Sequence, residues 1–226
     1  MCGRFTLRTP LNLLVEQLML DFALGELPPR YNIAPTQPAA VVRQADDGQR
    51  RMDFLRWGLV PSWAKDMAIG NRLINARAET VAEKPAFRAA FKRRRCLVPT
   101  DGYFEWQAQG KAKQPYLIEM QDGEPFAFAG LWESWQAPDG SPLETFTLIT
   151  TDANETTRPI HDRMPVILSP EAHAMWLDGD FEARQPLLDL LVPFEAEPMR
   201  TTPVSRHVNN PRNDDPECVA VQKELF

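Results

Sequence analysis

The second residue of the chain is a cysteine, and this position gives it chemistry that an internal cysteine lacks. Since the side chain of Cys2 is small, we expect Met1 to be removed, which leaves a free α-amine beside the thiol. An α-amine has a pKa of about 7.7–8.0 and is available as a nucleophile near neutral pH. It condenses with an aldehyde to an imine, on which a neighbouring thiol can close to form a thiazolidine. The opening of the chain therefore fits an aldehyde trap, although a cysteine beside the start residue can also be incidental.

A second stretch with chemical potential covers residues 73–79, where polar and apolar residues alternate. If this stretch is extended, Asn75, Arg77 and Glu79 share one face, because successive side chains of a strand point to opposite sides. An amide, a guanidinium and a carboxylate on one face could hold a polar, anionic ligand. The alternative is an edge strand or the start of a helix with solvated charges.

Glu105 stands in a strand-like run between aromatic residues, in the order Tyr103, Phe104, Glu105 and Trp106. A carboxylate against an apolar wall has its pKa raised by desolvation, which suits a general acid or base near neutral pH. The alternative is a strand on which Glu105 faces water. That alternative is weakened because Tyr103 would share the face of Glu105.

His161 is one of three histidines and precedes Asp162 and Arg163 in a loop with a proline at each side. An imidazole beside a carboxylate and a guanidinium is an arrangement that proton transfer uses. A single histidine can equally be structural, and we assign that role to His173 and His207.

Composition limits the class of protein. The 226 residues are 43% hydrophobic and 25% charged, which is typical of a globular domain rather than a disordered chain. The three cysteines lie far apart without a CxxC pair, so we expect no metal site, no disulfide framework and a reducing cytoplasm. The chain has no apolar stretch of membrane-spanning length, and we expect no membrane association and no cofactor.

The net charge of −6 means that any nucleic-acid surface must be local. Its candidate residues are the arginines Arg4, Arg77, Arg158 and Arg163 and the basic run 92–95. A basic run at the end of a helix is usually a solvated face that the helix dipole favours, and we interpret residues 92–95 in this way.

The patterning predicts helices near residues 10–22, 79–94, 169–178 and 181–191, among eight strand-like runs between residues 39 and 168. Strands with interspersed helices but no regular βαβ order indicate an α+β fold. We expect one domain over residues 1–226, with an antiparallel or mixed β-sheet core that can close like a barrel and is flanked by helices. The last fifteen or so residues (212–226) would form a loosely packed tail.

Seven blocks occur in a characteristic order: residues 1–5 (MCGRF), 30–35 (RYNIAP), 56–63 (RWGLVPSW), 74–80 (INARAET), 96–99 (CLVP) with 102–106 (GYFEW), 161–166 (HDRMPV) and 203–205 (PVS). Together they resemble the SRAP domain (SOS-response-associated peptidase) proteins, which process abasic sites in DNA. The resemblance spans most of the chain, and nothing is carried over to residues 7–30, 135–157 and 211–226.

The resemblance implies covalent capture of abasic sites in single-stranded DNA, as at a stalled replication fork. The family's catalytic residues correspond to Cys2, Asn75, Glu105 and His161. Cys2 would form the imine and then the thiazolidine, and Asn75 would orient the amine or the sugar hydroxyl. Glu105 would move protons, by which it could also help the adduct to release as a lyase does. His161 would shuttle the proton that opens the sugar ring or polarise its leaving oxygen.

The resemblance also suggests the DNA contacts and the partners. Phosphates would meet Arg4, Arg77 and Arg163, since such contacts position a strand without reading its sequence. Trp63 and Trp106 would stack on unpaired bases. Asn32 and Pro35 would line the path of the strand. The partners would be single-stranded DNA with abasic sites and unidentified fork proteins, in the cytoplasm or, in a bacterium, on the nucleoid.

Two other functions remain open from the residues. N-terminal-nucleophile glutamine amidotransferases also begin Met-Cys-Gly, and there the thiol attacks an amide while the α-amine acts as base. A single-strand binder in which Cys2 is incidental is the other alternative. The peptidase in the family's name corresponds to the loss of Met1, by autoprocessing or by an aminopeptidase.

Overall fold

The strands form two sheets, of which the smaller carries the start of the chain. The structure is a computed structural model that describes residues 2–23, 25–110 and 112–222. Within these residues the smaller sheet has the strand order β14-β9-β8-β1-β3. Its strands are β1 (Phe5–Leu7), β3 (Arg30–Ile33), β8 (Gly102–Gln109), β9 (Ala112–Met120) and β14 (Met199–Pro203). Strand β1 lies between β8 and β3, so the residues just before it enter the sheet between two neighbouring strands.

The larger sheet closes into a barrel. Its order is β12-β11-β10-β7-β4-β5-β2, with β13 beside β10 and β6 beside β11. Strand β11 also pairs in parallel with β5, so β11, β10, β7, β4 and β5 form a closed ring. The strands are β2 (Phe22–Ala23), β4 (Pro38–Gln44), β5 (Arg50–Trp57), β6 (Asn75–Arg77), β7 (Arg95–Thr100), β10 (Phe126–Gln136), β11 (Pro142–Asp152), β12 (Arg163–Pro165) and β13 (Ile167–Leu168). The predicted α+β class with a mixed, barrel-like sheet is confirmed.

Aromatic side chains hold the two sheets together. The ring of Phe5 lies edge-on to Trp57 at 5.2 Å and to Phe128 at 6.1 Å, and Trp57 stacks on Phe146 at 6.2 Å. Pairs of this kind stabilise a core by about 0.5–1.5 kcal/mol beyond the area that they bury. Because Phe5 is anchored in this way, the chain just before it is held against the barrel.

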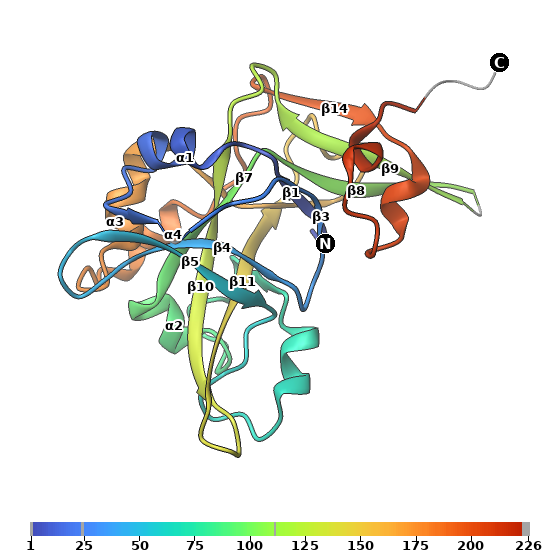
Figure 1. The fold of residues 1–226 in the computed structure, drawn as a ribbon. Helices are drawn as coiled ribbons and strands as arrows, with labels where there is room; N and C mark the ends of the chain where they lie inside the picture. Colours follow the sequence, from blue (N-terminus) through green and yellow to red (C-terminus); the bar gives the residue numbers. More distant parts are fainter. Residues whose placement is uncertain (1, 24, 111, 223–226) are drawn as a thin grey trace.

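The helices are short and lie outside the sheets. They are α1 (Leu11–Gln17), η1 (Met67–Arg72), α2 (Arg88–Arg93), η2 (Pro170–Ala172), α3 (His173–Leu177), α4 (Arg184–Asp189), η3 (Arg206–Asn209) and η4 (Pro216–Val219). Figure 1 shows α1, α3 and α4 together at one end of the molecule and α2 at the side of the barrel. None of the helices among the described residues is long and apolar enough to cross a membrane.

Two predicted helices are shorter than their sequence pattern indicated. The helix predicted for residues 10–22 ends at Gln17, and Met19 then turns the chain with a φ of 51°. The helix predicted for residues 79–94 spans only Arg88–Arg93. Pro85 lacks a backbone N–H and disfavours helical backbone in the residue before it, so residues 79–87 form turns instead.

The interpretation of residues 92–95 as a solvated basic face is wrong for Arg95. Its side chain is 2% exposed, and its guanidinium donates to the carbonyls of Trp176 (2.7 Å), Phe91 (2.8 Å) and Lys92 (2.6 Å). The adjacent Arg94 donates to Glu133 at 2.7 Å. These arginines therefore fasten α2 and α3 to the barrel.

The C-terminal segment is fixed to the small sheet as far as the structure describes it. Asp214 accepts backbone hydrogen bonds from Tyr31 (2.6 Å) and Asn32 (2.9 Å), and Cys218 is fully buried. Figure 1 shows this segment in red beside β8 and β9. Residues 212–222 are thus anchored, in contrast to the loose tail expected there, and residues 223–226 lie outside the described residues.

Candidate functional site

Cys2 is fully buried and is held by an amide from a distant strand. The side-chain nitrogen of Asn75 donates to the Cys2 carbonyl at 2.8 Å, and the Cys2 thiol lies 3.8 Å from the carbonyl oxygen of Arg4. Burial raises the pKa of the Cys2 thiol, and the negative charge of Glu105 raises it further. The thiol is therefore protonated at neutral pH. Met1, whose removal was predicted, lies outside the described residues.

The strand that carries Asn75 is positioned by a parallel pairing and a close backbone contact. In β6, Asn75 lies opposite Leu148 of β11. The loop before β6 folds back because the backbones of Gly58 and Gly70 lie in close contact. Gly58 has a φ of 120°, and a Cβ on Gly58 would lie 2.6 Å from the carbonyl oxygen of Gly70. Only glycine permits both the conformation and the contact. The buried Oδ1 atom of Asn75 has no hydrogen-bond partner among the described residues.

Glu105 reaches the site from β8, which pairs with β1. Phe5 lies opposite Tyr103, and the backbone N–H of Phe104 donates to the Arg4 carbonyl at 3.0 Å. Glu105 is 3% exposed, and this burial raises its pKa. The predicted burial of this carboxyl is confirmed, and its aromatic surroundings as the cause stay a prediction. The charge of Glu105 also acts on the Cys2 thiol, so the two side chains lie near each other.

His161 faces the same site from the loop between β11 and β12. Its Nδ1 atom lies 3.0 Å from the backbone nitrogen of Arg163 and 2.9 Å from a carboxylate oxygen of Asp162. These two contacts require opposite roles of Nδ1. The backbone N–H can only donate, whereas the Asp162 side chain is 86% exposed and can be solvated instead. Nδ1 is therefore the acceptor, and Nε2 carries the proton of the neutral ring.

An open pocket of about 470 Å³ adjoins Glu105 and His161, whereas Cys2 and Asn75 lie outside its lining. It is lined by Gly3, Arg4, Glu105, Trp106, Lys113, His161 and Asn209. His161 lowers the pKa of Glu105, against the larger effect of burial. The sequence motifs did not indicate Lys113 or Asn209. Both lie in segments without a distinctive local pattern, and only the pairing of β8 with β9 and the return of the C-terminal segment bring them here.

Arg4 forms the basic wall of this pocket. Its guanidinium donates to Asn32 Oδ1 (2.9 Å) and to the Val208 carbonyl (2.8 Å), and it lies 5.7 Å from the centre of the Trp106 ring. Burial lowers the pKa of Arg4. Trp106 in turn donates from its indole nitrogen to Asn209 Oδ1 at 2.7 Å. The predicted phosphate contact and one predicted stacking residue therefore lie side by side.

Asn32, predicted to line the strand path, is fully buried and does not line the pocket. Its side-chain nitrogen donates to the carbonyls of Val208 (3.2 Å), Asn210 (3.1 Å) and Asn213 (2.7 Å). The side chain therefore holds the C-terminal segment in place. Pro35 is half-buried and also lies outside the pocket lining.

Trp63 is 59% exposed, in a turn before η1. It does not line the pocket, so the structure separates it from Trp106. An exposed indole is free to stack on a base, and the predicted role of Trp63 stays a prediction.

Arg77 and Arg163 differ in whether nearby carboxylates balance their charges. Arg77 is exposed on β6 and makes no ion pair with any described residue. Arg163 donates to Glu79 at 2.6 Å and to Asp152 at 2.7 Å, so two carboxylates already balance its charge. Their predicted phosphate contacts remain predictions, and Arg77 is the better placed of the two.

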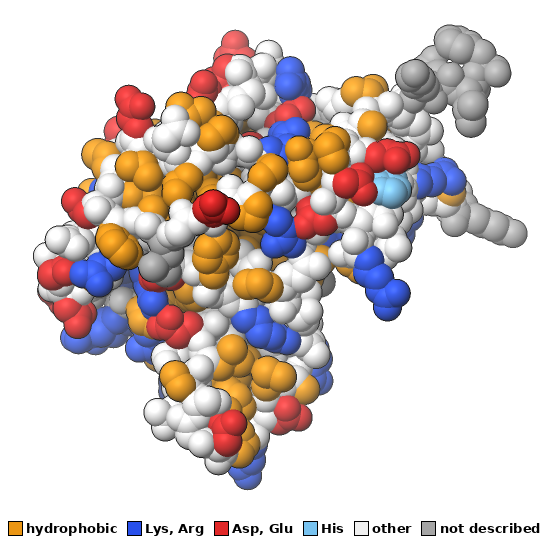
Figure 2. Space-filling view, viewed as in Figure 1, with side chains coloured by type: hydrophobic (Ala, Val, Ile, Leu, Met, Phe, Trp, Pro, Cys, Tyr) orange, Lys and Arg blue, Asp and Glu red, His pale blue; other side chains and the backbone are white. Residues whose placement is uncertain are grey.

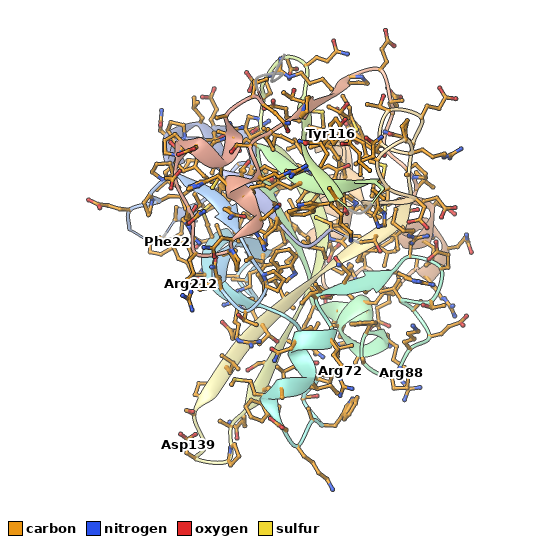
Figure 3. All side chains as sticks on the ribbon, turned by 90° about the vertical axis from the view of Figure 1, so that its right-hand side faces the viewer. Phe22, Arg72, Arg88, Tyr116, Asp139 and Arg212 are labelled. Carbon is orange, nitrogen blue, oxygen red and sulfur yellow. The ribbon has the colours of Figure 1, made fainter. Side chains whose placement is uncertain are left out.

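Basic groups are spread over the surface. Figure 2 shows Lys and Arg side chains interspersed with Asp and Glu, without one continuous basic band on this face. On the face that bears β6, Figure 3 shows Arg72 and Arg88 in the lower part. Positive potential is therefore local, as the acidic net charge required.

The fold also brings together three possible metal ligands that the spacing did not indicate. Ligand atoms of His207, Asp215 and Cys218 lie within 4.8 Å of one another. The His207 ring lies 3.0 Å from the Asp215 carboxylate, which raises the pKa of His207, and the Cys218 thiol donates to the Asn213 carbonyl at 3.5 Å. His207 and Asp215 are therefore paired with each other, and the Cys218 thiol is paired with a backbone carbonyl.

A sequence profile, curated proteins and a solved structure all match most of this chain. The sequence profile described as SOS response associated peptidase (SRAP) matches residues 1–211. Abasic site processing protein YoqW of Bacillus subtilis is 45% identical over 222 residues, which cover 97% of this chain and 99% of that protein. Abasic site processing protein HMCES of Xenopus tropicalis is 36% identical, covering 85% of this chain and 66% of that protein. A solved structure from Bacteroides thetaiotaomicron superposes with a TM-score of 0.86 at 28% identity, over 98% of this chain and 100% of that one.

Proposed function

From the premise that this chain belongs to the SOS response associated peptidase (SRAP) family, we propose that it processes abasic sites in single-stranded DNA by capturing them covalently on Cys2. The observation that carries the proposal is that Asn75 holds the buried Cys2 by a hydrogen bond, while Glu105, whose charge acts on Cys2, lines an open pocket together with His161. The ring-opened deoxyribose of an abasic site bears an aldehyde at C1′. The names of the relatives agree with this substrate.

The proposed reaction has two bond-forming steps. After loss of Met1, the Cys2 amine adds to C1′ of the aldehyde, and the resulting carbinolamine loses water to give an imine. The Cys2 sulfur then adds to the imine carbon, the C=N electron pair moves to nitrogen, and the thiol proton ends on that nitrogen. The net change is the loss of one water and the gain of a five-membered thiazolidine ring.

The surrounding side chains supply position and protons. Asn75 holds the Cys2 carbonyl at 2.8 Å, and its Oδ1 atom is an acceptor for the N–H of the amine or for a sugar hydroxyl. Glu105, whose pKa is raised by burial, exchanges protons with the thiol and with the intermediate. The Nε2 proton of His161 serves the sugar-ring oxygen as the ring opens. Each role matches the donor or acceptor that the side chain presents.

The DNA strand would be held by the basic and aromatic wall of the pocket. In this wall Arg4 provides positive charge and Trp106 a surface on which an unpaired base can stack, and the exposed Arg77 on β6 adds positive charge outside the pocket lining. The pocket is open to solvent, so a strand can approach it from outside. This arrangement supports single-stranded DNA as the substrate.

A denaturing gel tests the proposal. The protein is mixed with single-stranded DNA that contains one abasic site, and heat-stable complexes are separated from free DNA. We expect a heat-stable band for the unchanged protein, none for Cys2→Ala, and a heat-labile adduct for Cys2→Ser, which retains the amine but lacks the thiol. Cys218→Ser removes a second fully buried thiol far along the chain and should cross-link like the unchanged protein.

Two results would overturn the proposal. An equally durable cross-link from Cys2→Ala would rule out the thiazolidine. Release of ammonia from glutamine by the unchanged protein, without any cross-link, would instead identify an N-terminal-nucleophile amidotransferase. Intact mass measurement of the adduct should give the mass of the chain without Met1.

A further inference from the structure

A buried hydroxyl lies beneath the site without a role in the packing. Tyr103 is fully buried, and its hydroxyl approaches Thr157 but makes no hydrogen bond of standard geometry with any described residue. Burying a hydroxyl without a hydrogen bond carries a desolvation cost that phenylalanine would avoid. The ring alone already makes its contact, edge-on to Phe128 at 5.8 Å. The oxygen atom therefore requires an explanation other than packing.

The position of Tyr103 relates it to the reacting groups. On β8 it shares a face with Glu105, and on the neighbouring β1 it lies opposite Phe5, three residues after Cys2. Burial raises the pKa of Tyr103 well above its usual value, and the charges of Cys2 and Glu105 raise it further. The hydroxyl therefore stays protonated. It can act as a hydrogen-bond donor to a negative charge on the Cys2 sulfur.

The turn beside the Tyr103 hydroxyl also carries the imidazole of the site. The carbonyl of Thr157 accepts the backbone N–H of His161 at 3.1 Å. The hydroxyl of Thr157 donates to the buried Asn154 at 3.0 Å, and Asn154 donates to the Phe194 carbonyl at 2.9 Å. These bonds fix Thr157 and with it the turn that the Tyr103 hydroxyl approaches and that carries His161.

We infer that Tyr103 is a positioning residue whose hydroxyl donates a hydrogen bond to the Cys2 thiolate as the thiazolidine ring closes. The inference rests on the proposed function. In this step the Cys2 thiol gives its proton to the Glu105 carboxylate, and the sulfur forms its bond to C1′. The C=N electron pair moves to nitrogen, which takes the proton back from Glu105. Imine formation does not involve the sulfur and does not need the Tyr103 hydroxyl.

Tyr103→Phe tests the inference, because it removes only the oxygen atom. Reduction with sodium cyanoborohydride traps the imine, and heating without reductant leaves only the thiazolidine. We expect Tyr103→Phe to form trapped imine at the rate of the unchanged protein, but to form heat-stable adduct about tenfold more slowly or worse, as loss of a hydrogen bond to a charged group predicts. Its unfolding temperature should equal or exceed that of the unchanged protein.

Tyr31→Phe is the matched control, since Tyr31 packs on the smaller apolar cluster around Phe104 and lies outside the pocket lining. It should leave both rates unchanged. Heat-stable adduct from Tyr103→Phe at the unchanged rate would overturn the inference, as would an equal loss of imine and of heat-stable adduct. A clear fall in its unfolding temperature would assign the hydroxyl to the fold instead. If the unchanged protein itself formed no adduct, the proposed function would fail. A failure that is confined to the Tyr103→Phe comparison would instead overturn only the inference about Tyr103.

Discussion

The side chain of Asn32 connects the N-terminal and C-terminal parts of the site, and replacing it with alanine measures that connection. Its nitrogen donates to the carbonyls of Val208, Asn210 and Asn213 at 3.2, 3.1 and 2.7 Å. Its oxygen accepts from Arg4 at 2.9 Å. Asn32→Ala removes all four bonds at a position that is fully buried. We expect it to destabilise the protein rather than simply to weaken DNA binding.

The size of the loss follows from the bonds. A typical hydrogen bond contributes about 1 kcal/mol net, and the buried amide of Asn32 takes part in several, so we expect a loss of roughly 2–4 kcal/mol in the free energy of unfolding. For a protein of this length, each 1 kcal/mol lowers the unfolding temperature by about 2–4 °C. The expected fall is therefore roughly 4–16 °C.

Differential scanning calorimetry measures this fall, with Asn71→Ala as the control. Asn71 is exposed and accepts one bond from Arg56 at 3.0 Å, so its removal should change the free energy of unfolding by less than about 0.5 kcal/mol. If Asn32→Ala unfolded at the same temperature as the unchanged protein while its affinity for single-stranded DNA dropped, the reasoning would be refuted. Asn32 would then be the DNA contact that the sequence resemblance implied.

Two charged residues give further tests. Burial raises the pKa of Glu105, so the folded state binds its proton more tightly than the unfolded state, and stability falls as pH rises from the unfolded value of about 4.3 through the folded one. Glu105→Gln should therefore unfold at a higher temperature than the unchanged protein at pH 7 and at the same temperature near pH 3; a lower temperature at pH 7 would contradict this. Arg77→Gln, in a Cys2→Ala background, should reduce the slope of log affinity against log salt concentration by about 0.7 for single-stranded DNA, measured by fluorescence anisotropy. An unchanged slope would exclude a phosphate contact at Arg77.

Local patterns predicted several features correctly. The alternation around Asn75 and Arg77 did indicate an extended segment, and β6 spans both residues. The aromatic neighbours of Glu105 did indicate burial, and the carboxyl is 3% exposed. In both cases the signal lies within a few residues, because strand geometry and desolvation by adjacent side chains act over that distance.

Other features depended on contacts between distant segments. The strands β1 and β3 were not predicted, because each has at most four residues and is stabilised by its neighbours in the sheet rather than by its own composition. Arg95 ends a basic run in the sequence, which predicts a solvated side chain. In the structure its guanidinium instead donates to backbone carbonyls of α2 and α3. No local rule distinguishes a solvated arginine from one that a later helix covers.

The sequence by itself determined the chemistry that each residue can offer: an amine and a thiol on Cys2 once Met1 is lost, an amide at Asn75, a carboxyl among aromatics at Glu105 and an imidazole at His161. These are properties of residue type and immediate neighbours. Only the tertiary structure decided that they meet, through the parallel pairing of β6 with β11 and the antiparallel pairing of β8 with β1. It also made Asn32 an internal anchor and buried the Tyr103 hydroxyl beneath the site. The physical reason is that strand pairing is selected by the packing of the whole core, which no short segment encodes.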